Sequence, residues 1–185
     1  SARRIRAVLE EQPALATPAD PVAAVADGSI DFADVSFKYS AAAARDALSH
    51  VTLHIPAGAT VGIIGGTGAA KTTLVQLIPR LYDATSGTVK VGGQDVRRYY
   101  LAALRDAVGI VLQKNLLFSG TIRDNLRWGD PNADDETLWA ACRAACADEF
   151  LKRMPDGLDT DMGQGGVNVS GGQKQRLCIA RTLLK

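Results

Sequence analysis

Residues 65–73 read GGTGAAKTT, and their types and spacing suit the binding of a phosphate chain. A common phosphate-binding loop has a glycine, four free positions and then Gly-Lys-Ser/Thr, and Gly65, Lys71 and Thr72 stand where that pattern requires them. Consecutive glycines allow backbone N–H groups to converge on an anion, and a helix that starts near Lys71 would add the positive end of its dipole. The lysine would reach the β- and γ-phosphates, and the threonine hydroxyl would be offered to Mg²⁺. We therefore predict a nucleotide site in this loop.

The loop departs from the pattern at one position, because Ala70 stands where the second glycine is expected. If the backbone there requires a positive φ, a Cβ costs roughly 1–2 kcal/mol, which is about 5- to 30-fold in affinity. A methyl group directed at the phosphate would cost more, and the sequence leaves these two alternatives open. Both predict a weakened site, not an absent one. A glycine-rich turn with an incidental Lys-Thr is the alternative to a nucleotide site, and the apolar strand pattern before the loop and the helical pattern after it disfavour that alternative.

A second glycine-containing motif lies near the end of the sequence, where residues 167–181 read VNVSGGQKQRLCIAR. A serine followed by two glycines can simply cap the start of a helix. In its context, however, the run Val169, Ser170, Gly171, Gly172 and Gln173 resembles the signature motif of ATP-binding-cassette (ABC) ATPases, usually written LSGGQ. The continuation KQRLCIARTLL resembles the same family.

Further resemblances to ABC ATPases lie between the two motifs and ahead of them. Tyr39, at the end of VSFKY, matches the aromatic residue on which adenine stacks in this family, and Gln113, in IVLQKN, matches the glutamine that contacts Mg²⁺ and the attacking water. The stretch LFSGTIRDNLRWG, residues 117–129, resembles that of ABC exporters. Taken alone, Tyr39 is equally explained as a packed strand aromatic, and Gln113 is better explained as a solvated loop residue. Only the combination of these residues with the two glycine-containing motifs favours a nucleotide site.

The elements that must position the loop can be predicted from hydrophobic periodicity. Apolar residues alternate from 30 to 39 and change phase between Phe32 and Val35, which indicates a bulge, and they alternate again from 51 to 55. The segment TVGIIG, residues 60–65, is continuously apolar and predicts a central strand buried on both faces. The spacing of apolar residues then predicts a helix over 71–82, with a kink or an early end at Pro79.

Beyond this helix the pattern predicts a change from strands to helices. Residues 86–96 indicate a short strand and turn, 101–108 a short helix, and 109–113 another buried strand. From residue 115 onward helical patterns dominate, and a glycine-rich stretch leads into the last helix.

Composition and charge exclude several classes of protein. The chain of 185 residues is 46% apolar and 22% charged, which is ordinary for a globular protein. A net charge of +1 gives no reason to expect a nucleic-acid partner. Three cysteines argue against a disulfide framework, and no apolar stretch reaches the roughly 20 residues that a membrane helix needs.

The resemblance implies an α/β fold: a P-loop NTPase core with an N-terminal antiparallel β subdomain and a helical subdomain, incomplete at the C-terminus. Residues 1–26 would be the tail of a preceding transmembrane domain and a proline-containing linker, and residues 27–185 a partial nucleotide-binding domain with its helical subdomain at about 115–175. We expect the sequence to be part of a longer chain, because it starts without methionine and ends within a helical pattern.

The resemblance also implies the site and its cofactors, ATP and Mg²⁺. Lys71 and Gln113 would act in catalysis, and Thr72 and Gln113 would contact the metal. The nucleotide-binding residues would be Tyr39, Gly65, Gly66, Thr67, Gly68, Ala69, Ala70, Lys71, Thr72, Thr73, Gln113, Ser170, Gly171, Gly172 and Gln173.

The function implied is that of an ATPase domain powering an exporter at the cytoplasmic face of the cell membrane. Its partners would be a second nucleotide-binding domain, identical or not, and the transmembrane domain of the same chain. The alternative is a nucleotide-binding but poorly hydrolysing subunit of a heterodimeric exporter, which Ala70 favours. The acidic Walker B strand end and the catalytic glutamate of the family have no counterpart in the sequence, so we expect this stretch alone not to hydrolyse ATP.

Overall fold

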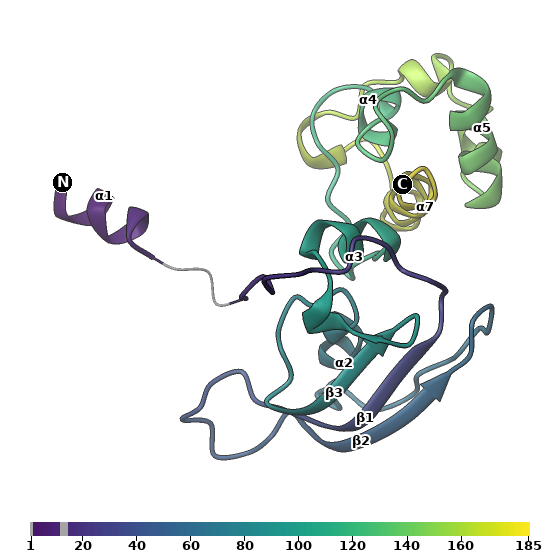
Figure 1. Cartoon of the computed structure of the whole chain (residues 1–185). Coiled ribbons are helices and arrows are strands. Elements are labelled where there is room, and N and C mark those ends of the chain that lie inside the picture. Colours follow the sequence, from purple (N-terminus) through teal and green to yellow (C-terminus); the bar gives the residue numbers. More distant parts are fainter. Residues whose placement is uncertain (1, 12–14) are drawn as a thin grey trace. The chain divides into compact units, whose positions relative to one another are not determined.

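The computed structural model describes residues 2–11 and 15–185 and divides into two compact units, Ser1–Val108 and Gly109–Lys185 (Figure 1). Residues 12–14, in the predicted linker, lie outside the described residues. None of the helices in the described ranges is both long and apolar enough to cross a membrane. The helices are α1 (Ala2–Leu9), α2 (Lys71–Leu77), α3 (Leu101–Ala107), α4 (Ile122–Leu126), α5 (Asp135–Ala144), α6 (Asp148–Leu151) and α7 (Gly171–Leu183).

The first unit is built on an antiparallel sheet with strand order β2-β1-β3-β4. Its strands are β1 (Ile30–Phe37), β2 (Leu48–Ile55), β3 (Ser86–Val91) and β4 (Gln94–Asp95). The pairing of β1 with β2 shifts register between Phe32 and Val35, and Asp34 has a φ of 51° there. The phase change in the sequence therefore marks a real bulge, as predicted.

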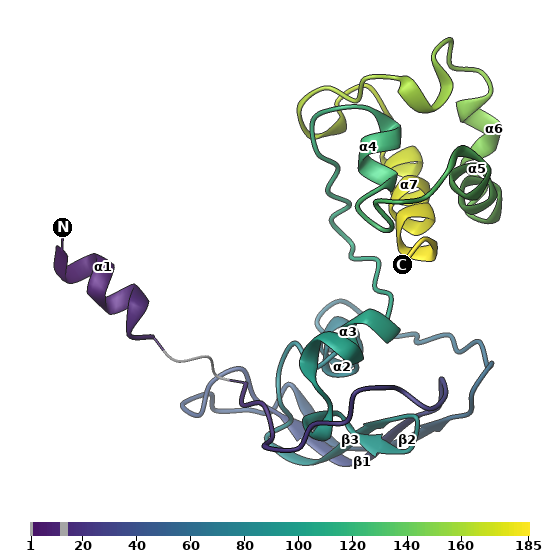
Figure 2. The same cartoon turned by 45° about the horizontal axis from the view of Figure 1, so that its top comes forward.

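Helices α2 and α3 lie over one face of this sheet (Figure 2). Leu77 of α2 and Leu104 of α3 are fully buried in the same apolar cluster as Phe32, Val35 and Phe37 of β1. Helix α2 ends at Leu77, ahead of Pro79, because proline cannot continue the hydrogen-bonding of a helix. The predicted helix over 71–82 is thus correct in type and shorter in extent, as the proline had indicated.

The described residues of the segment before β1 are attached to this unit by several contacts, two of which lie far from β1 in the sequence. Arg80 is buried, and its Nη2 donates to the carbonyl oxygen of Ala16 at 2.9 Å while its Nε donates to Asp83 at 2.7 Å. Val22 forms a parallel bridge with Tyr99. These bonds place residues 16 and 22 against the body that carries α2.

Two predicted central strands are absent from the described structure. Residues 60–65 and 109–113 have no strand assignment, and Ile64 is 99% exposed. A strand buried on both faces needs neighbouring strands and covering layers, and within residues 2–11 and 15–185 no strand pairs with either segment. The prediction of buried strands at 60–65 and 109–113 is therefore wrong for this structure.

The second unit is helical, as the patterns beyond residue 115 predicted. Its core contains Ile122 and Leu126 of α4, Leu138 of α5 and Leu177 of α7, all at most 1% exposed. Buried Asn125 joins the preceding loop to α4, because its amide accepts from the N–H of Phe118 at 2.7 Å and donates to the Phe118 carbonyl at 2.9 Å.

Candidate nucleotide-binding site

The loop at 65–70 leads directly into α2, and Ala70 is the N-cap residue of that helix. Ala70 has φ 55° and ψ 22°, in the left-handed region. The consensus glycine adopts such angles without strain, whereas an alanine Cβ is crowded against the following peptide. The structure thus meets the condition of the first alternative left open by the sequence, a positive φ at residue 70.

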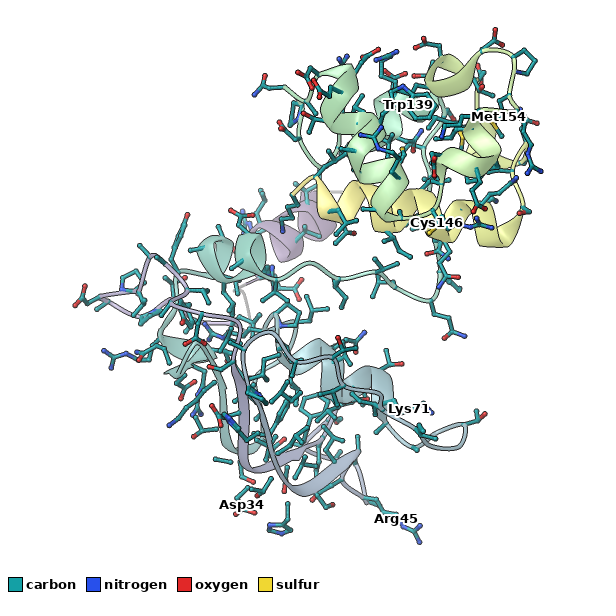
Figure 3. All side chains as sticks on the ribbon, turned by 90° about the vertical axis from the view of Figure 1, so that its right-hand side faces the viewer. Asp34, Arg45, Lys71, Trp139, Cys146 and Met154 are labelled. Atoms are coloured by element: carbon teal, nitrogen blue, oxygen red, sulfur yellow. The ribbon has the colours of Figure 1, made fainter. Side chains whose placement is uncertain are left out.

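The Lys71 side chain folds back over the loop. Its Nζ donates to the carbonyl oxygens of Gly65 at 2.7 Å and Gly66 at 2.8 Å. Figure 3 marks Lys71 at the loop end of α2. These two bonds hold a positive charge at the centre of the loop, where an anion can meet both the ammonium group and the unpaired N–H groups of the first helical turn.

Tyr39 lies beside the start of the same helix. Its hydroxyl forms a hydrogen bond of 2.8 Å with Oγ1 of Thr73, the third residue of α2. The ring contacts Phe37 edge-on at a centroid distance of 4.9 Å and Tyr82 at 5.4 Å, yet Tyr39 remains 58% exposed. The hydroxyl bond and the two ring contacts therefore hold the tyrosine in place, and part of its ring surface stays exposed to solvent.

A cavity of about 390 Å³ joins Tyr39 to the loop. Its lining residues are Tyr39, Asp46, Ala47, Gly68, Ala69, Ala70, Lys71, Thr72 and Thr73. The volume falls in the range of small-molecule sites. Seven of these nine residues were predicted from the sequence, while Gly65 and Gly66 contribute the carbonyls that hold Lys71 and Thr67 connects them to Gly68.

Asp46 and Ala47 are the two lining residues that sequence reasoning missed. They close the connection between β1 and β2, where the Ala47 N–H donates to the Phe37 carbonyl at 2.8 Å. Asp46 forms an ion pair with Lys38, with 3.3 Å between Nζ and Oδ1. No local pattern signals their role, because it depends on hairpin closure bringing residue 46 back beside residue 39.

The signature residues form the start of α7 in the second unit. Ser170 is the N-cap: its Oγ accepts from the N–H of Gln173 at 3.3 Å, and the Gln173 side chain accepts from the N–H of Ser170 at 2.8 Å. This is a capping box, so the serine cap considered from the sequence is present. Helical geometry leaves the N–H groups of Gly171 and Gly172 without an intrahelical acceptor, and both residues are exposed.

Gln113 is exposed and lies in an irregular segment of the second unit. The cavity is built from the first unit alone, so the structure brings together Tyr39, the loop and the first turn of α2. The roles of Gln113 and of Ser170, Gly171, Gly172 and Gln173 toward a nucleotide stay predictions.

The residues available to a divalent cation in the first unit are sparse. Thr72 is an exposed residue of the first turn of α2 and follows Lys71 directly in the sequence. Within the part of the chain that the structure describes, no group of three or more His, Cys, Asp or Glu residues could hold a metal by itself. A single hydroxyl donor suits Mg²⁺, which binds through few protein oxygens plus substrate phosphates and water.

Comparison with known proteins agrees with this geometry. The family described as ABC transporter matches residues 48–185. The chain is 42% identical over 98% of its length to the Multidrug efflux ATP-binding/permease protein of Mycobacterium bovis (strain BCG / Pasteur 1173P2), covering 15% of that protein. It is 40% identical over its whole length to the ATP-dependent lipid A-core flippase of Desulfotalea psychrophila, covering 32% of it.

A solved structure is similar as well. The structure of a bacterial Atm1-family ABC exporter with ATP bound superposes with a TM-score of 0.91 at 35% sequence identity. The match covers 99% of this chain and 32% of that one. The chain thus spans a third or less of the length of these relatives.

Proposed function

The chain belongs to the ABC transporter family as an ATP-binding domain of the exporter type, and on this premise we propose that it binds ATP beside Tyr39 and hydrolyses it within a full-length exporter. One observation carries the proposal: an aromatic ring and a phosphate-binding loop line the same cavity. The ring suits a base, and the loop suits the phosphates.

In this proposal each group of the cavity has a separate task. The N–H groups at the start of α2 bind the phosphates, helped by the helix dipole. Lys71 exchanges its two loop carbonyls for phosphate oxygens, so its charge is available without any large movement. Thr72 would hold Mg²⁺, which neutralises charge on the transferred phosphate when it is bound. Gln113 would orient the attacking water.

We further propose that two such domains close on the nucleotide at the cytoplasmic face of a membrane. Gly171 and Gly172, with Ser170 and Gln173, would present the start of α7 to the γ-phosphate bound by the facing domain. The capping box supports this, because it orders the helix start while it leaves the two glycine N–H groups without an intrahelical acceptor. Closure on ATP and release after hydrolysis would move the attached transmembrane domains.

A second function is favoured by Ala70. Its left-handed backbone strains the loop, which suits a subunit that binds nucleotide and dimerises but hydrolyses it poorly beside a more active partner. The two functions differ in turnover and share the binding site.

Calorimetric titration with Mg-ATP tests the shared site. Lys71→Ala should weaken binding at least 10-fold, because it removes the charge that contacts the phosphates. Lys90→Ala is the matched control, since Lys90 lies on β3 outside the cavity lining and should bind as the wild type does. Equal affinities for the two variants would overturn the site.

Phosphate release by the full-length transporter then separates the two functions. Turnover that depends on Lys71 and Gln113 supports the hydrolytic domain. Tight binding with negligible turnover supports the poorly hydrolysing subunit.

A further inference from the structure

The cavity contains one carboxylate, Asp46, that the proposed binding of phosphates and base does not use. It is an unexpected residue there, because a negative charge does nothing to attract a nucleotide triphosphate. Its side chain is 30% exposed and belongs to the cavity lining together with Tyr39. The position of a carboxylate where the nucleobase is proposed to bind therefore needs a chemical explanation.

The closing of the β1–β2 hairpin fixes Asp46 beside the tyrosine. Phe37 and Leu48 are register partners, and the segment between them returns through the Ala47 N–H bond to Phe37. Lys38 precedes Tyr39 directly and holds Asp46 Oδ1 at 3.3 Å. The carboxylate is thus tied to the neighbour of the stacking residue. Arg45, the residue before Asp46, extends away from Lys71 into solvent (Figure 3).

The carboxylate retains the capacity to accept further hydrogen bonds. Its two oxygens offer about four acceptor positions in all. Lys38 takes one of them, and the Ser49 hydroxyl reaches Oδ2 only at 3.5 Å, the long limit of a hydrogen bond. An ionised carboxylate has no proton to donate, so it attracts an amine and repels a carbonyl oxygen.

Within the purines and within the pyrimidines, bases differ at one ring position in whether they can donate a hydrogen bond to a carboxylate. Adenine and cytosine carry an exocyclic amine, whereas hypoxanthine and uracil carry a carbonyl oxygen at the same ring position. We propose that Asp46 determines base specificity by accepting a hydrogen bond from that exocyclic amine, so that the site prefers ATP and CTP over ITP and UTP. This inference rests on the proposed function, in which a nucleotide base lies on Tyr39.

The simpler explanation of Asp46 is that its ion pair with Lys38 only stabilises the connection between β1 and β2. The two explanations differ in how the dissociation constant depends on the base. An ion pair that only positions Tyr39 would change the dissociation constants of all nucleotides by the same factor, and so would the negative charge of Asp46. An acceptor for the amine changes the ratio of dissociation constants between an amino base and its oxo counterpart.

The test is calorimetric titration of the full chain with ATP, ITP, CTP and UTP. The wild type should bind each amino nucleotide about 5- to 10-fold more tightly than its oxo counterpart, the range expected for a partly solvated hydrogen bond to a charged group. Asp46→Asn, which can both donate and accept, should bring both ratios close to one, and Asp46→Ala should do the same. Lys38→Gln removes the ion pair without touching the carboxylate and should keep the wild-type ratios.

Three results would overturn the inference in distinguishable ways. Wild-type ratios near one, with tight binding of all four nucleotides, would leave the site in place and remove its base specificity. Ratios that survive in Asp46→Asn and Asp46→Ala would assign the preference to another residue. Failure of the wild type to bind any of the four would overturn the proposed function itself.

Discussion

Two helix starts in this chain are candidates for phosphate binding, and they are built in opposite ways. Helix α2 follows Ala70, whose side chain offers no cap and whose backbone is left-handed. Helix α7 follows Ser170, which forms a complete capping box with Gln173. The first start has a strained N-cap residue that gives no side-chain cap, whereas the second satisfies part of its own backbone through the capping box. The two helix starts therefore differ in how much of their own backbone they satisfy.

The contrast predicts that Ala70→Gly has the largest effect of the substitutions at the two starts. The strain of Ala70 is part of the fold itself, so removing the Cβ relieves roughly 1–2 kcal/mol, and Ala70→Gly should raise the free energy of unfolding measured in denaturant by circular dichroism. Ala69→Gly is the control, because Ala69 is not among the residues with positive φ and should gain nothing. Equal free energies of unfolding for wild type and Ala70→Gly would show that the loop tolerates the methyl group.

Ser170→Ala should act on stability. Loss of an N-cap costs about 1 kcal/mol, and the loss should appear in denaturant unfolding followed by tryptophan fluorescence. Both tryptophans, Trp128 and Trp139, lie in the second unit, so the signal reports that unit alone. Ser119→Ala, at an exposed serine of the same unit, should unfold as the wild type does. An unchanged midpoint for Ser170→Ala would remove the distinction between the two helix starts.

The smallest effect expected is a dependence of the second unit on pH. The backbone N–H of Thr121 lowers the pKa of Asp124, the backbone N–H of Thr137 lowers that of Asp134, and Arg123 lowers that of Asp159. A carboxyl group whose folded pKa lies below its unfolded value stabilises the fold fully above about pH 5 and loses that contribution as the pH falls through the folded value.

We therefore expect the tryptophan-reported stability of the second unit to be flat above about pH 5 and to fall below about pH 4. Asp159→Asn should make this fall shallower, because it removes one of the linked protons. A stability that rises on acidification would contradict the assignment of these carboxylates as caps and ion-pair partners.

The sequence was most informative where chemistry depends on neighbours along the chain. Gly65, Lys71 and Thr72 predicted a phosphate loop followed by a helix, and the structure has that helix starting at Lys71. The change of phase after Phe32 predicted the bulge at Asp34. Pro79 predicted the early end of α2. The helix start and the early end of α2 are decided by backbone angles and hydrogen bonds within a few residues, and the bulge is visible in the local alternation of apolar residues although it lies in the pairing of β1 with β2.

It was least informative where a segment needs a distant partner. Residues 60–65 and 109–113 have the composition of central strands, but hydrophobicity specifies only a preference for burial and not the strand that would satisfy the backbone. In the described structure these segments are unpaired, and Ile64 is exposed. Asp46 was missed for the same reason, since its place beside Tyr39 follows from the pairing of β1 with β2.

By itself, the sequence determined the loop, the helix behind it, the capping serine and the resemblance to ABC exporters, because short motifs carry their chemistry in residue type and spacing. Only the tertiary structure decided that Ala70 is left-handed, that Tyr39 bonds to Thr73, and that Asp46 lines the same cavity. The physical reason is that a strand pairing brings together residues from separate parts of the chain, and no local pattern of residues encodes which side chains will then face one another.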